Sequence, residues 1–186
     1  QLPSYSPDYN PIEKLFWGRT NIKFACSTFY YVEQTPLQQL IHQVKYKEQQ
    51  KLGIYLGTAM GNLLNPVFSD HEVDLLIPMP LHPKKLKKRG YNQLHVFADT
   101  LSKNWEIPHH KEALKRNSYQ KAQAQKDKSH RAETKYDFSL TEEISGKHVL
   151  LIDDVFTTGN TISAIAWEIL KNPRNEVSVL VMAFDS

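Results

Sequence analysis

The spacing of apolar residues changes near the C-terminal end of the chain in a way that predicts a strand, a helix and a second strand. Residues 147–152 end in four consecutive aliphatic residues, which is typical of a strand buried on both faces of a parallel sheet. Residues 161–170 carry apolar side chains at helical spacing, and residues 177–183 are aliphatic again. A crossover of this length predicts a right-handed βαβ unit, with a turn over residues 153–160 between strand and helix.

Three other short segments predict strands. β-Branched and aromatic residues predict one over residues 22–32, and an apolar run that ends in prolines predicts a buried one over residues 73–80. Residues 110–116 form a third candidate. The lysine-rich segment at 84–89 follows the second strand and is expected to be a loop. Strands that alternate with helices indicate an α/β protein.

Helical spacing occurs in three segments before residue 110. The first follows Thr35-Pro36, which match an N-cap and a proline at the first helical position. The second is expected over residues 49–64, where Asn65-Pro66 stops it. The third is expected after Tyr91, because apolar residues three and four positions apart share one face. Those residues are Leu94, Phe97, Ala98 and Leu101.

The chain is expected to consist of an N-terminal arm or hood over residues 1–35 and one larger domain over residues 36–186. Residues 1–20 carry three prolines among polar and aromatic residues, which is typical of an irregular arm. Residues 117–135 hold almost no large apolar residues, so a solvated, mobile segment is expected there. A chain of 186 residues is long enough for one good-sized core.

Composition narrows the classes of protein without selecting a function. Hydrophobic residues make up 40% of the chain and charged residues 23%, as in ordinary globular proteins. No apolar run approaches the length of a membrane span, and no secretory signal pattern opens the sequence. Cys26 is the one cysteine, which excludes an internal disulfide and a cysteine-rich zinc site and predicts a cytoplasmic location. The net charge of +3 is too small to indicate nucleic-acid binding by itself.

Residues 153–161 combine two acids, several hydroxyls and a glycine at the start of a helix. The first amides of a helix lack intrahelical partners and carry partial positive charge, so a phosphate is expected there. Gly159 permits a positive φ and a close approach of the ligand. Asp153 and Asp154 suit the vicinal hydroxyls of a ribose or Mg²⁺-bound water. The alternative is a capped turn with solubilising acids, but the complete string favours a ribose 5-phosphate.

The segment Ile152–Thr161 closely resembles the signature with which type I phosphoribosyltransferases bind phosphoribosyl pyrophosphate (PRPP). This resemblance implies a twisted, mostly parallel α/β sheet with helices on both faces and a small N-terminal hood. It also implies that Asp153 and Asp154 contact the ribose diol while the following loop holds the 5′-phosphate. The implied phosphate-binding residues are Thr157, Thr158, Gly159, Asn160 and Thr161.

A narrower resemblance, to the ComF family of competence-associated phosphoribosyltransferase-like proteins, covers most of the chain. Its most telling part is Arg89-Gly90-Tyr91-Asn92-Gln93, preceded by residues 77–82. The family's mobile loop has a glutamine-to-arginine pattern that Gln123 and Arg131 match, although residues between and after them depart from it. Family members often begin with a cysteine-rich zinc ribbon, and this chain starts about where that ribbon would end, which predicts a ribbon before residue 1.

Five cations stand in the six residues at 84–89. In the phosphoribosyltransferase interpretation this loop meets the pyrophosphate, with Lys88, Arg89 and Gly90 as the contacts. The alternatives are a solvated surface loop and a patch that binds nucleic acid. Only the pyrophosphate interpretation explains why the cluster lies between a strand end and a helix start. The eight histidines lack metal-ligand spacing, so no zinc is expected in this chain.

The resemblance implies a protein that binds PRPP, with Mg²⁺ held through PRPP near the two aspartates. An active protein would be a pentosyl-transferring enzyme of nucleotide metabolism that joins the phosphoribosyl group to a nitrogen nucleophile and releases pyrophosphate. Asp153, Asp154 and Arg89 would be its catalytic residues, and residues 117–131 a lid that excludes water. The amidophosphoribosyltransferases share this signature, but their glutaminase half needs an N-terminal cysteine that this sequence lacks.

A second hypothesis stays open at this point. In it, the domain is a non-catalytic module that binds PRPP or a 5′-phosphate and acts with single-stranded DNA and competence proteins. The sequence holds no motif that selects an acceptor base, and no segment predicts insertion into a membrane.

Overall fold

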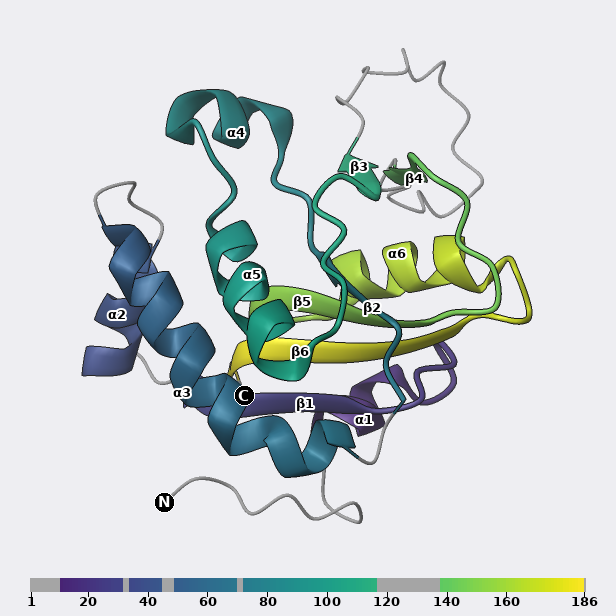
Figure 1. Cartoon of the computed structure of the whole chain (residues 1–186), viewed down its shortest axis with the longest axis horizontal. Helices are drawn as coiled ribbons and strands as arrows, with labels where there is room; N and C mark the ends of the chain where they lie inside the picture. The colour runs from purple at the N-terminus through teal and green to yellow at the C-terminus, as the bar shows by residue number, and fades with distance from the viewer. Residues whose placement is uncertain (1–10, 32–33, 45–48, 70–71, 117–137, 186) are drawn as a thin grey trace, which may run out of the picture.

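A fully parallel sheet of four strands forms the centre of the protein (Figure 1). The computed structural model describes residues 11–31, 34–44, 49–69, 72–116 and 138–185. The strand order is β1-β6-β5-β2, so β5 and β6 are the inner pair. The four strands are β1 (Ala25–Tyr31), β2 (Leu75–Pro78), β5 (His148–Phe156) and β6 (Glu176–Asp185). The predicted βαβ unit is confirmed as β5, α6 (Asn160–Leu170) and β6.

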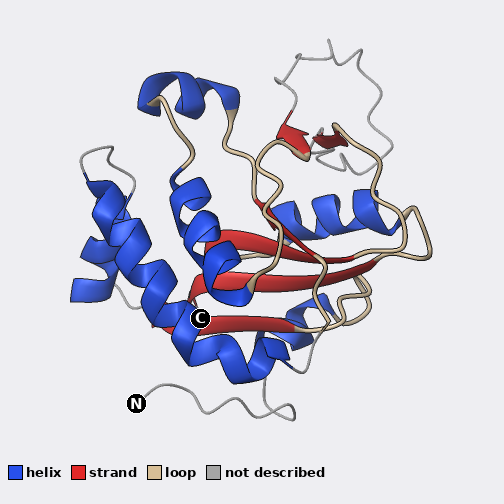
Figure 2. Cartoon of the chain, viewed as in Figure 1, coloured by secondary structure: helices blue, strands red, loops and turns tan. Residues whose placement is uncertain are grey.

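Helices cover both faces of this sheet, which confirms the predicted architecture (Figure 2). α3 (Gln50–Ser69) and α5 (Gln93–Trp105) pack together on one face, whereas α1 (Pro11–Phe16) and α6 lie on the other. α2 (Pro36–Val44) packs against α3, and α4 (Pro83–Arg89) projects from the body between β2 and α5. A separate antiparallel pair consists of β3 (Leu114–Arg116) and β4 (Phe138–Leu140).

The inner strands are buried because their aliphatic side chains face helices on both sides. Residues 149–152 and 179–181 are all 0% exposed. Each such side chain contributes about 1.5–3 kcal/mol by leaving water. The division of the chain at residue 35 stays a prediction; the structure adds that β1, from the segment predicted as the hood, pairs with β6 along the edge of the main sheet.

Cys26 lies in β1 and is 4% exposed. Burial raises the pKa of its thiol to about 12, with the nearby carboxylate of Glu13 acting in the same direction. The thiol is therefore protonated at neutral pH and behaves as a small apolar side chain. Among the residues that the structure describes, no helix is long and apolar enough to cross a membrane.

A line of glycines on α3 lets that helix approach α5 closely. Gly57 and Gly61 are four residues apart on the same helical face. A Cβ atom at Gly57 would lie 2.7 Å from Cβ of Thr100, and one at Gly61 would lie 2.5 Å from Nδ2 of Asn104. The indole of Trp105 also donates a hydrogen bond of 3.0 Å to the carbonyl of Gly61. Contact of this kind fixes the position of α5 on the sheet.

The lysine-rich segment is a helix, α4, and the prediction of a loop was wrong. Pro83 occupies its first turn, and the ring of His82 accepts a hydrogen bond of 3.2 Å from the amide of Lys84. Gly90 ends the helix with φ of +79°, as glycine commonly does at helix C-termini. α4 has no buried residues, so its sequence lacks the apolar periodicity that predicts a helix. Its lysines therefore indicated a loop although the signals at both helix ends were present.

Two further boundaries differ from the predictions. α3 continues through Pro66 to Ser69 because Phe68 adds to its buried face, with the ring of Phe68 centred 4.3 Å from that of Trp105. β5 continues through both acids to Phe156, whose side chain is 1% exposed and pairs in register with Phe184. The predicted N-cap of α2 is confirmed, since Thr35 Oγ1 accepts a hydrogen bond of 3.4 Å from the amide of Gln38.

We expect Gly57→Ala to lower the free energy of unfolding by about 1–3 kcal/mol, because the added methyl group overpacks the α3–α5 contact. Urea denaturation followed by circular dichroism measures this loss. Asn62→Ala, at an exposed position of the same helix, is the control and should be neutral or slightly stabilising. Equal stability of the two variants would contradict the close packing.

Candidate functional site

The two acids lie inside β5, near its carboxyl end, and not in the turn where they were predicted. Both are half-buried. Asp153 Oδ1 accepts a hydrogen bond of 2.8 Å from the amide of Asp154, and Asp154 Oδ1 accepts one of 2.8 Å from the amide of Val155. Side chains alternate across a strand, so the two carboxylates leave it on opposite sides. The pair can therefore face a ligand from two directions at the sheet edge where ligands of open α/β proteins bind.

The turn between β5 and α6 is tight and needs glycine. Gly159 has φ of +71°, and a Cβ atom there would lie 2.7 Å from Cζ of Phe156. Phe156 is held in turn by Phe16 of α1, with ring centroids 5.5 Å apart in an edge-to-face arrangement. The turn therefore has a fixed shape, set by an aromatic ring beneath it.

The start of α6 leaves amide groups open to an anion. Gly159 is the N-cap and has no side chain to bond them. The first turn closes through a hydrogen bond of 2.8 Å from the amide of Ser163 to the carbonyl of Gly159. Thr157, Thr158 and Asn160 are exposed and Thr161 is half-buried. The structure thus gathers all five predicted phosphate-binding residues at one helix N-terminus, where the dipole favours negative charge.

A hydrogen-bonded relay joins the segment after α4 to the acid pair. Gln93, the first residue of α5, donates a hydrogen bond of 3.1 Å from Nε2 to Oδ2 of Asp154. The guanidinium of Arg89 donates to Oε1 of the same glutamine. Gln93 is 5% exposed, so this relay is largely sheltered from water. Sequence reasoning gave Gln93 no role of its own, although it stood in the string that carried the ComF resemblance.

Asn92 holds the two ends of this segment together. Its Oδ1 accepts a hydrogen bond of 3.1 Å from the amide of Leu94, which caps α5. Its Nδ2 donates one of 3.0 Å to the carbonyl of Met79, just after β2. The segment from Met79 to Asn92, which contains α4, therefore begins and ends at one fixed point beside β5.

The predicted pyrophosphate contacts divide into two groups. Arg89 is half-buried and reaches the acid pair through Gln93, and Gly90 adjoins it in a left-handed conformation. Lys88 is exposed on α4, as are the other lysines of that helix, and no contact joins it to the acid pair in the described structure. Gln123 and Arg131 lie outside the described residues, as does the predicted lid.

A cavity of about 850 Å³ opens beside this segment, between α4, α5 and β3. Gly90, Tyr91 and His95 form part of one wall, and Lys115 and Arg116 of β3 lie opposite. Burial lowers the pKa of His95, so its ring is neutral at pH 7. The described residues contain no group of three side chains that could hold a metal ion by themselves.

Comparison with known proteins shows what this part of the chain is similar to. The model of the phosphoribosyl transferase domain matches residues 95–184, which include β5, the turn and α6. Competence protein F of Haemophilus influenzae is 27% identical over 83% of this chain and 69% of its own length. The DNA utilization protein YhgH of Escherichia coli O157:H7 is 29% identical over 77% of this chain and 65% of its own length.

The competence protein ComFC of Bacillus subtilis is also similar, at 23% identity over 71% of this chain and 52% of its own length. The chain is therefore similar to competence proteins of the ComF type and to the phosphoribosyl transferase domain. It spans from about half to about two thirds of the length of these relatives. The adenine phosphoribosyltransferase of Leishmania tarentolae aligns at 12% identity with a TM-score of 0.44, over 99% of this chain and 94% of its own.

The ComF resemblance drawn from the sequence is thereby confirmed. The string from Arg89 to Gln93 precedes the region that the domain model matches. The relay joins Arg89 and Gln93, which belong to that string, to Asp154 of the phosphoribosyltransferase signature.

We expect Gln93→Ala to lower the free energy of unfolding by about 1–3 kcal/mol, because it removes the hydrogen-bonding partner that joins Arg89 to Asp154 in a buried site. Chemical denaturation measures this change. Gln50→Ala is the matched control, since Gln50 is also the first residue of a helix but is exposed. If the two alanine variants lose the same small amount of stability, the relay contributes nothing measurable.

Proposed function

We propose that this domain binds PRPP along the carboxyl edge of β5. The 5′-phosphate would rest on the amides and hydroxyls at the start of α6, and the ribose hydroxyls would face Asp153 and Asp154. The pyrophosphate would extend toward Arg89 and Gly90. The single observation that carries the proposal is the relay through Gln93, because it links the acid pair predicted for the ribose to the cation predicted for the adjoining pyrophosphate.

Magnesium fits this arrangement only together with PRPP. Mg²⁺ in phosphate sites is held by one or two carboxylates and completes its shell with phosphate oxygens and water. Asp153 and Asp154 supply such carboxylates at the strand end. When bound, the ion would neutralise charge on the pyrophosphate.

An active domain would transfer the phosphoribosyl group to a nitrogen nucleophile. The bond from the anomeric carbon to the pyrophosphate oxygen breaks, and pyrophosphate leaves with the bonding electrons. A bond from nitrogen to the same carbon forms, and the nitrogen loses a proton. Arg89 would stabilise the negative charge of the leaving group, and the acid pair would orient the ribose. The lid proposed for residues 117–131 would exclude water from this step.

Replacing both acids, in Asp153→Asn with Asp154→Asn, should weaken Mg²⁺–PRPP binding by about 1–3 kcal/mol, because charge-assisted hydrogen bonds are lost. Calorimetric titration with Mg²⁺–PRPP measures this change. Asp185→Asn is the matched control, since Asp185 is an exposed aspartate at the carboxyl end of neighbouring β6. Unchanged affinity in the double variant would refute the role of the acids, whereas a wild-type chain that does not bind Mg²⁺–PRPP would refute the proposed function.

Catalysis is tested separately, by release of pyrophosphate from PRPP with a panel of nucleobases and amines. Acceptor-dependent release that the double variant loses supports a transferase. Binding of PRPP without release under any acceptor favours a module that senses PRPP or a 5′-phosphate.

The name of one relative, DNA utilization protein, favours a second candidate function, in which this module acts on DNA; the form proposed is single-stranded DNA. The described surface offers a test, because Lys84, Lys85, Lys87 and Lys88 are exposed on α4 whereas Arg89 is engaged with Gln93. If these lysines bind DNA phosphates, the affinity should fall with salt at a logarithmic slope of about −2.8, from roughly 0.7 per contact. Fluorescence anisotropy of labelled single strands at several salt concentrations measures this slope.

PRPP should compete with DNA if the two ligands share α4. Changing the four lysines to glutamine should abolish the salt-dependent binding, while Lys103→Gln on α5 and Lys171→Gln just after α6, both at exposed positions, serve as controls. Tight DNA binding that neither PRPP nor the α4 variant affects would place the DNA surface elsewhere.

A further inference from the structure

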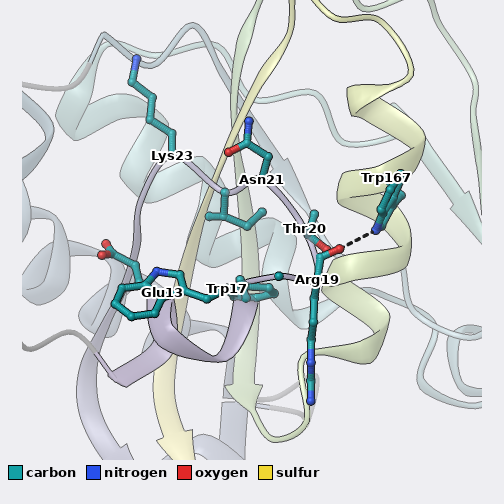
Figure 3. Close-up of a pocket in the computed structure, with 10 residues that line it drawn as sticks. Glu13, Trp17, Arg19, Thr20, Asn21, Lys23 and Trp167 are labelled. Carbon is teal, nitrogen blue, oxygen red and sulfur yellow. Dashed lines mark hydrogen bonds between the residues drawn. The ribbon is translucent and has the colours of Figure 1, made fainter.

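The segment between α1 and β1 takes no part in the site described so far. It borders a cleft of about 570 Å³ whose opposite wall includes Trp167 of α6 (Figure 3). Arg19 lies at one end of the part of this segment that borders the cleft, and Lys23 lies at the other end. Lys23 is paired with Glu176 at 2.7 Å, at the amino end of β6. In the described part of the chain, the guanidinium of Arg19 has no hydrogen-bond or ion-pair partner.

The backbone of Arg19 is fixed at two points. Its amide donates a hydrogen bond of 2.9 Å to the carbonyl of Phe16, the last residue of α1. Its carbonyl accepts one of 3.1 Å from the indole Nε1 of Trp167. The side chain of Arg19 is exposed, but its starting point is therefore tied to α1 and to α6.

From this anchor the side chain points toward the start of α6. Figure 3 shows Arg19 extending away from Lys23, along the side of α6 and toward the strand ends. Trp167 lies seven positions after Asn160, which is about 10 Å of helix. Helical side chains lean toward the N-terminus, so the indole of Trp167 covers part of that distance. A fully extended arginine covers much of the rest.

Contacts of α1 with the phosphate turn support this direction. A Cβ atom at Gly159 would lie 3.5 Å from Cε1 of Phe16, three residues before Arg19. The ring of Phe16 also packs on that of Phe156, at the end of β5. The segment that carries Arg19 thus leaves α1 beside the turn that precedes α6.

The charges near the start of α6 favour a cation as a further phosphate-binding group. Asp153 and Asp154 are acidic, and the five residues from Thr157 to Thr161 carry no formal charge. Arg89 of α4 approaches the acid pair from the start of α5, through Gln93, and is assigned to the pyrophosphate. Within the described turn and acid pair, a phosphate at the start of α6 would otherwise meet neutral donors near two carboxylates. A guanidinium matches phosphate oxygens with two parallel hydrogen bonds.

We infer that Arg19 is a ligand-binding residue that contacts the 5′-phosphate held at the start of α6, so that α1 and its following segment complete the phosphate site. This inference rests on the proposed function. It assigns to Trp167 a positioning role, since its indole holds the carbonyl of Arg19.

The test uses ribose 5-phosphate and pyrophosphate as separate probes, with calorimetry on the whole chain. Arg19→Gln should raise the dissociation constant for ribose 5-phosphate about tenfold and leave that for pyrophosphate unchanged. Arg19→Lys should recover part of the affinity because it keeps the charge without the planar fork. Trp167→Phe should weaken ribose 5-phosphate binding by a smaller factor.

Lys23→Gln is the matched control, because it removes the same charge from the other end of the same segment. It should leave both dissociation constants within about twofold of the wild type. Equal binding of ribose 5-phosphate by the wild type, Arg19→Gln and Lys23→Gln would overturn the role of Arg19 while leaving the proposed function intact. A wild-type chain that binds neither ribose 5-phosphate nor Mg²⁺–PRPP would overturn both.

Discussion

The parallel pairing of β5 with β6 and β2 is the constraint on which the remaining structure depends. Eight residue pairs join β5 to β6 and four join it to β2, so β5 is surrounded by hydrogen-bonded neighbours. Parallel strands need crossovers that return to the starting edge, and these crossovers cover both faces with helices. The acids at the end of β5 therefore stand at an edge toward which α5 and α6 both direct their N-terminal ends.

The site is assembled from three parts of the chain, each held by contacts outside it. The turn before α6 rests on Phe156, which is packed by Phe16 of α1. The start of α5 is fixed by the cap of Asn92 and by the close contact of α5 with α3. Gln93 then spans the gap to Asp154. Preorganisation of this kind lets a ligand bind without first ordering the groups that contact it.

The sequence predicted what local patterns determine. Aliphatic runs and helical spacing revealed β5, α6 and β6, and Thr35-Pro36 marked the start of α2. The signature at 152–161 is sufficient to predict where the candidate phosphate site lies. These features are encoded in neighbouring residues, so one segment at a time suffices to identify them.

What the sequence missed depends on contacts between distant residues. Pro66 does not stop α3, because Phe68 gains a partner in Trp105, 37 positions further along the chain. Gln93 and Asp154 are separated by 61 positions, and Arg19 and Trp167 by 148. Pairs so far apart leave no periodic pattern of apolar residues in the sequence. α4 was missed for a different reason, since its end signals are local but its lysines have no buried face to reveal them.

The protonated, buried thiol of Cys26 has a practical consequence for spectroscopy. A cysteine whose pKa is raised to about 12 presents almost no thiolate to alkylating reagents at neutral pH. Cys26 should therefore react little with maleimides, so it need not be replaced before labelling. A reporter cysteine introduced on the exposed surface of α4 could carry a fluorophore alone, which would turn the lysine helix into an optical probe of its own movement.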